Sequence, residues 1–147
     1  MNEKSLSARE YLGQLQELDT IIKQDTERLN EMKENATGVG AIRYDKERVQ
    51  TSPRNALEES VCNRITYEQM LNEKISKFIS AKEQIIEEIR GLHQNNYIQL
   101  LYKVYVQFKS LKEVSVEIDK SYPYVIELHK KALKMFEETY TNLSYLT

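Results

Sequence analysis

The sequence predicts an all-α protein, built from a long antiparallel helical hairpin that forms a coiled-coil arm and from a smaller head of short helices. The 147 residues include only four glycines and two prolines, and 30% of them are charged, which is typical of long helices. Over two long stretches, apolar residues recur at alternating spacings of four and three, the pattern of helices with one buried face.

Two long helices are expected, the first over residues 6–36 and the second over about 55–92. The apolar seam of the first consists of Tyr11, Leu15, Leu18, Ile22, Leu29, Met32 and Ala36, with Asp25 interrupting it. The later half of the second has Leu71, Ile75, Phe78, Ile85, Ile89 and Leu92, with Lys82 interrupting it. Because a helix is stabilised mainly by burying its apolar face, we expect the two to pair with each other or with copies from another chain.

The segment between these helices, residues 37–54, holds two glycines and a proline among mixed charges, which indicates a loop. Residues 1–94 are therefore expected to form a coiled-coil helical arm with loop 37–54. The remaining residues, 95–147, are expected to form the head, which starts with a short helix over 97–108.

Signals for two further helices follow in the head. Ser110 and Glu113 fit a capping box, in which the serine side chain accepts from the Glu113 amide and Glu113 reaches back. The helix that follows is expected to bury Leu111, Val114 and Ile118, and it ends at the polar turn 119–121. Ser121 or Tyr122 then caps a longer helix with Pro123 in its first turn. The buried stripe of that helix is expected to be Val125, Leu128, Ala132, Leu133 and Phe136.

A short helix, a tight turn and a longer helix with outward lysines make a helix-turn-helix candidate. Its second helix would enter the major groove of DNA. The net charge of −2 argues against a general polyanion binder, but four lysines and a single Glu127 occupy residues 120–134. Glu127 is suited to accept from a cytosine amino group, and lysines are suited to contact phosphates. Spacing alone leaves both a DNA reader and a plain helical bundle open.

A resemblance to known families favours the DNA reader. The segment KEVSVEIDKSYPYVIELHKKALKMFEE (112–138) resembles region 4 of bacterial sigma factors. With RVQTS (48–52), LHKKAL (128–133) and the long helices, nearly the whole chain resembles the ArpU/RinA-like phage transcriptional regulators. The chain departs from the pattern twice, because Asp119-Lys120 replaces the usual turn glycine and Ser115 replaces an alanine under the recognition helix.

The resemblance implies a sigma-region-4-like helix-turn-helix domain over 95–147 that binds double-stranded DNA. It also implies regulation of late phage or prophage genes in the cytoplasm of a bacterial host cell. We expect the DNA-binding residues to be Lys120, Ser121, Tyr122, Tyr124, Glu127, Lys130, Lys131 and Lys134. The arm is expected to form a homodimer or to bind RNA polymerase or another protein, by analogy of fold.

Two other functions stay open. One is a small-terminase-like DNA-packaging component, which would form ring-sized oligomers. The other is a helical interaction protein that acts on a protein partner through its arm. A coiled-coil face in contact with water is the simplest explanation for the carboxylates of that arm.

We expect no enzyme, no cofactor and no metal site. Cys62 has no partner at a metal-ligand spacing, and His93 and His129 lie far apart in the sequence. His129 is expected to pack or to contact a phosphate. The sequence has no phosphate-binding glycine loop, nucleophile elbow or zinc motif. Neither a membrane span nor a signal peptide is expected, and the single cysteine is consistent with a cytoplasmic protein.

Overall fold

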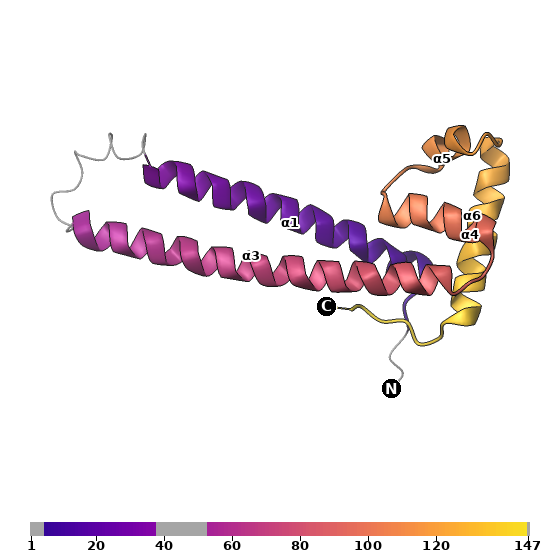
Figure 1. Cartoon of the computed structure of the whole chain (residues 1–147), viewed down its shortest axis with the longest axis horizontal. Coiled ribbons are helices and arrows are strands. Elements are labelled where there is room, and N and C mark those ends of the chain that lie inside the picture. Colours follow the sequence, from indigo (N-terminus) through magenta and orange to yellow (C-terminus); the bar gives the residue numbers. More distant parts are fainter. Residues whose placement is uncertain (1–4, 38–52, 147) are drawn as a thin grey trace. The chain divides into compact units, whose positions relative to one another are not determined.

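Figure 1 shows a computed structural model of the chain, which describes residues 5–37 and 53–146. The regular elements of this part are all helical, so the prediction of an all-α protein is confirmed. They are α1 (Ala8–Thr37), α3 (Pro53–Arg90), α4 (Asn95–Leu101), a π-helical turn (Tyr102–Val106), α5 (Leu111–Glu117) and α6 (Tyr122–Thr139). Residues 38–52 of the expected loop, including the RVQTS motif, lie outside the described residues.

The chain divides into two compact units. Unit 1 comprises the described residues of Met1–Asp19 and Lys77–Thr147, and unit 2 those of Thr20–Ser76. Residues 95–147, the expected head, thus share unit 1 with the start of α1 and the end of α3. The domain boundary expected at residues 94 and 95 stays a prediction.

Within unit 2, α1 and α3 run antiparallel and make a largely polar contact. Asp25 on α1 accepts hydrogen bonds from Tyr67 at 3.0 Å and from Lys74 at 2.6 Å on α3. The hydrogen bond from Lys74 is the main reason why the pKa of Asp25 is lowered. Among the described side chains of this unit, Leu29 and Leu71 are the buried apolar ones. The charged residue that interrupts the apolar seam of α1 is therefore held by partners on α3.

Unit 1 contains two apolar clusters, and α6 contributes to both. The larger cluster joins the start of α1, the end of α3, the π-helical turn, α6 and the C-terminal tail. Its fully buried large side chains are Leu12, Leu15, Ile85, Ile89, Leu101 and Phe136. The smaller cluster consists of Leu100, Val114, Val125 and Leu128. Both α4 and α5 pack against α6, as Figure 1 shows, so these two elements help to set the orientation of α6.

The start of α1 is capped both by its own sequence and by α6. The Glu10 amide donates to the Ser7 hydroxyl at 3.2 Å, and the Ser7 amide donates to the Glu10 carboxylate at 3.1 Å. The Ala8 amide donates to Glu137 of α6 at 2.9 Å. The C-terminal tail adds a further contact, because the Leu6 amide donates to the Leu143 carbonyl at 2.9 Å.

Gly91, directly after α3, allows the ring of Tyr140 to approach the helix end. The Tyr140 hydroxyl donates to the Glu88 carbonyl at 2.7 Å. A Cβ atom on Gly91 would lie 2.3 Å from that hydroxyl oxygen, closer than two unbonded atoms can come. The absence of a side chain at position 91 is therefore a condition for this hydrogen bond.

We predict that Gly91→Ala lowers the free energy of unfolding by about 1–2 kcal/mol, because Tyr140 must move and lose its hydrogen bond. Gly13→Ala is the matched control, since its Cβ would meet nothing within 4 Å. In the interior of α1 it should raise the free energy of unfolding by up to about 1 kcal/mol. Urea denaturation measures both, and a Gly91→Ala protein as stable as the parent would contradict the prediction.

Candidate nucleic-acid interface

Helix α5 begins where the sequence predicts. Ser110 has extended backbone angles (φ −77°, ψ 161°), and its hydroxyl accepts from the Glu113 amide at 3.1 Å. The reciprocal bond of a full capping box is not formed among the described residues. Val114 is fully buried, whereas Leu111 and Ile118 are half-buried. The predicted inward face of α5 is therefore the one that packs.

The turn between α5 and α6 accommodates both departures from the sigma-region-4 pattern. Asp119 adopts a left-handed conformation with φ 55°, which glycine usually supplies and which aspartate tolerates. The Asp119 amide donates to the Val116 carbonyl at 3.3 Å and the Lys120 amide to the Ser115 carbonyl at 3.0 Å, which is a Schellman motif. The hydroxyl of Ser115 donates to the Lys112 carbonyl at 2.7 Å, so its polar atom is satisfied within α5.

Helix α6 begins with Ser121, whose hydroxyl accepts from the Tyr124 amide at 3.2 Å, and Pro123 lies in the first turn. Proline fits there because the first amides of a helix have no partner within it. The buried residues of α6 include the predicted Val125, Leu128, Ala132 and Phe136, and Leu133 is half-buried. This stripe fixes which side chains of α6 face away from the core.

All eight predicted DNA-binding residues are exposed. They are Lys120, Ser121, Tyr122, Tyr124, Glu127, Lys130, Lys131 and Lys134. Helical geometry puts Tyr124, Glu127, Lys131 and Lys134 on the side of α6 opposite its buried stripe. Lys130 lies 3.6 Å from Glu127, with both side chains more than 60% exposed, and an ion pair this exposed contributes little.

Lysines outside the recognition helix also gather at this surface. The ammonium group of Lys120 lies 5.8 Å from the centre of the Tyr124 ring. That of Lys112, on α5, lies 5.8 Å from the centre of the Tyr122 ring. The sequence prediction omitted Lys112, although its position opposite Val114 on a short amphipathic helix was a usable signal.

Two further lysines of unit 1 have a different role. Lys103 and Lys109 each donate to the Glu117 carboxylate at 2.8 Å. These hydrogen bonds, that of Lys103 first, lower the pKa of Glu117. Both lysines are therefore paired within the protein and hold α5 against the residues that precede it.

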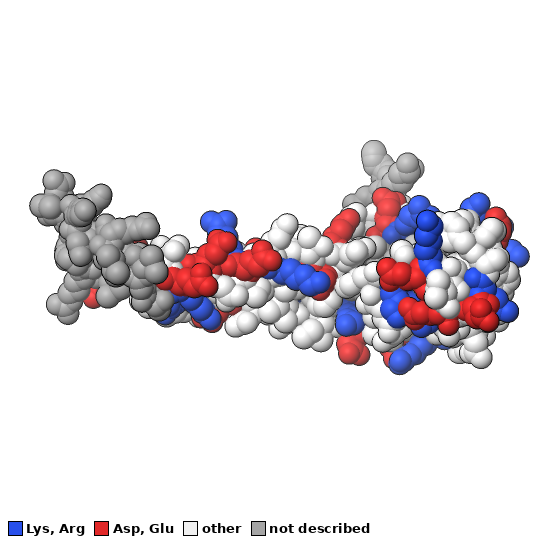
Figure 2. Space-filling view, turned by 90° about the horizontal axis from the view of Figure 1, so that it is seen from above, with Lys and Arg blue, Asp and Glu red and all other residues white. Residues whose placement is uncertain are grey.

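Positive and negative side chains alternate over this region. Where α4, α5 and α6 lie, Figure 2 shows Lys and Arg interspersed with Asp and Glu over the face in view. Residues 95–147 carry seven Lys or Arg and six Asp or Glu. On the face in view the positive charge is therefore divided among separate positions, without the continuous basic patch of a general polyanion binder.

His129 has a packing role, because α6 turns it toward the core. Only 4% of its surface is exposed, and its Nε2 atom shares a hydrogen bond of 2.8 Å with the Tyr105 hydroxyl. Burial, with a smaller contribution from Arg9, lowers the pKa of His129 to about 4. The imidazole is thus neutral at pH 7, and its burial keeps it from contacting a phosphate.

We predict that His129 makes the protein less stable as the pH falls from 6.5 toward 4. In this window the unfolded chain protonates the imidazole and the folded chain does not, so the free energy of unfolding falls with a slope of up to about 1.4 kcal/mol per pH unit. Glu117 and Asp25 have lowered pKa values and act at still lower pH. Urea denaturation at several pH values measures the slope.

The variant for this test is His129→Gln, which removes the titrating group and keeps a polar atom near Tyr105. Its slope between pH 6.5 and 4.5 should be clearly smaller than that of the parent. His93→Asn is the control, because His93 is exposed and has a left-handed backbone (φ 53°) that asparagine tolerates. An unchanged slope in the His129 variant would show that other groups cause the pH dependence.

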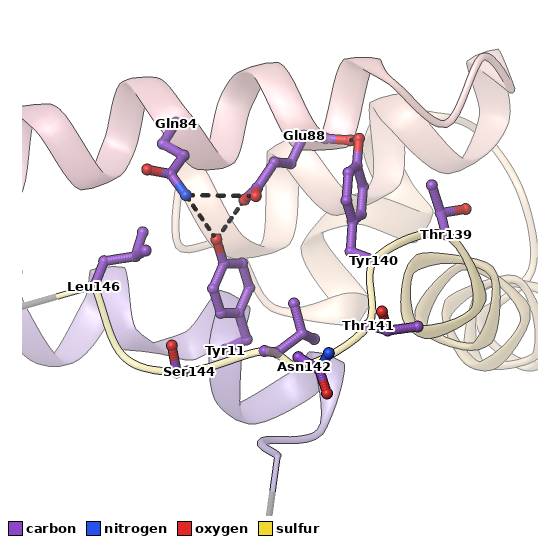
Figure 3. Close-up of a pocket in the computed structure, with 10 residues that line it drawn as sticks. Tyr11, Gln84, Glu88, Thr139, Tyr140, Thr141, Asn142, Ser144 and Leu146 are labelled. Atoms are coloured by element: carbon purple, nitrogen blue, oxygen red, sulfur yellow. Dashed lines mark hydrogen bonds between the residues drawn. The ribbon is translucent and has the colours of Figure 1, made fainter.

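A second polar site in unit 1 is a hollow of about 290 Å³ beside the C-terminal tail (Figure 3). Tyr11 donates a hydrogen bond to Glu88, and Gln84 lies 3.5 Å from both of them. Burial, followed by the effect of Glu88, raises the pKa of Tyr11. Since Tyr11, Gln84 and Glu88 bond to one another, these three side chains join α1 to α3 within unit 1.

The last observations concern metal ions, membranes and known proteins. Among the described residues, no three His, Cys, Asp or Glu side chains gather as they would around a metal ion, and Cys62 is exposed. None of the helices in the described part is long and apolar enough to cross a membrane. Neither a protein-family model, nor a curated protein, nor a solved structure matches this chain. The resemblance to ArpU/RinA-like regulators thus stays a prediction from the sequence.

Proposed function

We propose that this protein is a sequence-specific binder of duplex DNA that regulates transcription of phage or prophage late genes. In this proposal α5, the turn and α6 form a helix-turn-helix on a coiled-coil arm, and α6 enters the major groove. One observation carries it. All eight predicted DNA-binding side chains are exposed, and the buried stripe of α6 turns Tyr124, Glu127, Lys131 and Lys134 outward, while Ser121 caps the helix and Asp119 closes the turn before it.

The exposed residues of α6 fall into two groups, those suited to contact base edges and those suited to contact phosphates. Tyr122 and Tyr124 lie in the first turn of α6, where a recognition helix approaches base edges, and are 40% and 45% exposed. Glu127, one turn later, carries acceptor oxygens suited to the amino group of cytosine. Lys131 and Lys134 follow farther along the helix and are suited to phosphates.

The mixed charge of this surface supports sequence-specific binding of DNA more than non-specific binding. Phosphate contacts supply most non-specific affinity, and each released counterion makes binding more sensitive to salt. Three of the seven lysines of residues 95–147 lie next to a carboxylate, Lys103 and Lys109 at Glu117 and Lys130 at Glu127, so non-specific binding should be weak. Discrimination must then come from contacts to base edges and from DNA shape.

The proposal is tested by selecting bound duplexes from a random-sequence pool. The control is the triple variant Lys130→Glu, Lys131→Glu and Lys134→Glu, whose three side chains are exposed and leave the buried stripe intact. We expect a sharp motif from the parent that is absent from the control pool. No enrichment from the parent, even at low salt where phosphate contacts are strongest, would refute sequence-specific DNA binding and favour a protein that acts through its arm.

We predict that Glu127→Ala and Lys131→Ala act differently on binding. Loss of Glu127 should relax preference at one base pair by about 1–3 kcal/mol while binding to other sequences stays similar. Loss of Lys131 should weaken all sequences alike and reduce the slope of log affinity against log salt by about one unit. Fluorescence anisotropy with the selected duplex and single-base variants measures both, and a uniform loss for Glu127→Ala would refute its role.

A second candidate, a helical protein that acts on a protein partner through its arm, is favoured by unit 2. Its large exposed apolar side chains include Ile21, Ile65 and Met70, at 43%, 46% and 52% exposure. Such residues are suited to a partner, which would be RNA polymerase, another protein or a second copy of the chain. Retained partner binding by the triple glutamate variant would favour this candidate. Ring-sized oligomers in light scattering would instead favour a small-terminase-like packaging component.

A further inference from the structure

We infer that the polar hollow beside the C-terminal tail of unit 1 is a binding site for a guanidinium group, supplied by a small molecule or by an arginine of another protein. The hollow has a volume of about 290 Å³ and is lined by Tyr11 of α1, Glu88 of α3 and residues of the tail (Figure 3). This volume is at the lower end of the range for small-molecule sites, which suits one small group. The inference goes beyond the proposed function, because none of the eight predicted DNA-binding residues lines the hollow.

Glu88 gives the hollow a negative charge that the described part of the protein does not balance. Among the described residues, its carboxylate bonds to Tyr11 and Gln84, which are both neutral. None of the described residues that line the hollow is a lysine, an arginine or a histidine. Asp25 and Glu117, by contrast, each bind at least one lysine. Because Glu88 is half-buried, a bound cation would stabilise its charge.

The two neutral partners of Glu88 leave room for a charged one. Burial, followed by the effect of Glu88, raises the pKa of Tyr11, so its hydroxyl stays protonated at pH 7 and donates to the carboxylate. The Gln84 amide lies 3.5 Å from the second carboxylate oxygen. A carboxylate has about four lone-pair positions on its two oxygens. Positions for further N–H donors are therefore left on Glu88.

The tail supplies acceptors on the side of the hollow away from α3 (Figure 3). Thr141 and Ser144 line the hollow, and their hydroxyl groups make no hydrogen bond to the described residues. Gln14, only 2% exposed, anchors the tail, because its side chain accepts from the Leu146 amide at 2.9 Å and donates to the Tyr11 carbonyl at 2.8 Å. The two hydroxyl groups are thus carried by a segment that is held in place before a ligand binds.

This arrangement fits a guanidinium group better than it fits other cations. A guanidinium group carries five N–H donors in a planar fork, which can meet a carboxylate on one side and hydroxyl oxygens on the other. It is also more weakly hydrated than an ammonium group, so it enters a partly enclosed site more readily. A divalent metal ion would require more acidic ligands, and no three His, Cys, Asp or Glu side chains gather among the described residues.

The first test titrates the protein with methylguanidinium and follows the NMR shifts of the Thr141 and Ser144 amides. We expect saturable shifts with a Kd on the order of 1–10 mM, which is reasonable for a ligand of a few atoms. Methylammonium has the charge without the fork and should bind about tenfold more weakly. Methylurea has the shape without the charge and should not bind. Binding of either control ligand as tight as that of methylguanidinium, or an absence of saturable shifts, would overturn the inference.

The second test removes the charge of Glu88 and keeps its shape. Glu88→Gln retains an oxygen that can accept from Tyr11, and it should weaken binding of methylguanidinium about tenfold or more. Glu87→Gln is the matched control, because Glu87 is exposed on the same helix and does not line the hollow. It should bind as the parent does, and equal binding by the two glutamine variants would overturn the inference.

A variant of the tail keeps the test decisive if Glu88→Gln fails to fold. Ser144→Ala changes an exposed side chain without a hydrogen bond to the described residues, so the fold should be retained. It should weaken binding of methylguanidinium about threefold, because one acceptor is lost. Unchanged binding by Ser144→Ala would refute the role of the tail. The dispersion of the amide signals shows whether each variant is folded.

Two larger ligands distinguish the sources of the guanidinium group. Free L-arginine represents a small molecule, and the peptide acetyl-Gly-Arg-Gly-amide represents an arginine of another protein. Tighter binding of L-arginine would assign the site to a small molecule, and tighter binding of the peptide would assign it to a protein partner. Binding of neither would overturn the inference. Because no duplex is present in these measurements, their result is separate from the test of DNA binding.

Discussion

The buried stripe of α6 is the constraint on which the rest of unit 1 depends. Ala132 and Phe136 belong to the larger apolar cluster, and Val125 and Leu128 belong to the smaller one. A single helix thus joins the core under α1 and α3 to the core under α4 and α5. With four of its side chains fixed in this way, α6 cannot rotate about its axis. The packing of α6 therefore determines which of its side chains point outward and are available to a ligand.

The features of the fold that could be predicted from the sequence are those with a local sequence pattern. The two long helices, the Ser110 and Ser121 caps and the α6 stripe were predicted, since spacing and capping act within a few residues. The expected helix over 97–108 differs, because it changes to a π-helical turn at Tyr102 and ends with Phe108 in a left-handed conformation (φ 59°). Phe108 packs there against the larger cluster, a contact with residues distant in the sequence that no local pattern announces.

Contacts between distant residues account for most of what the sequence analysis missed. The pairing of Glu137 with the Ala8 amide joins positions 129 residues apart, and no local pattern announces it. The contact of Lys112 with the Tyr122 ring is of the same kind, because it forms only where α5 and α6 meet. The Ser7–Glu10 capping box is different. Its Ser-x-x-Glu pattern was present in the sequence and could have been recognised.

Unit 2 is held together, in its described part, by few buried apolar side chains and by a polar contact at Asp25 between its helices. Burying Leu29 and Leu71 contributes only about 3–6 kcal/mol, which is small beside the entropy lost in ordering two helices. The Asp25 contact with Tyr67 and Lys74 adds little stability but disfavours other registers, as polar seam residues do in coiled coils. The contacts between α1 and α3 in unit 2 therefore fix the register of the two helices but contribute little to the stability of the pair. The missing stability is what a partner covering Ile21, Ile65 and Met70, as proposed for the second candidate function, would supply.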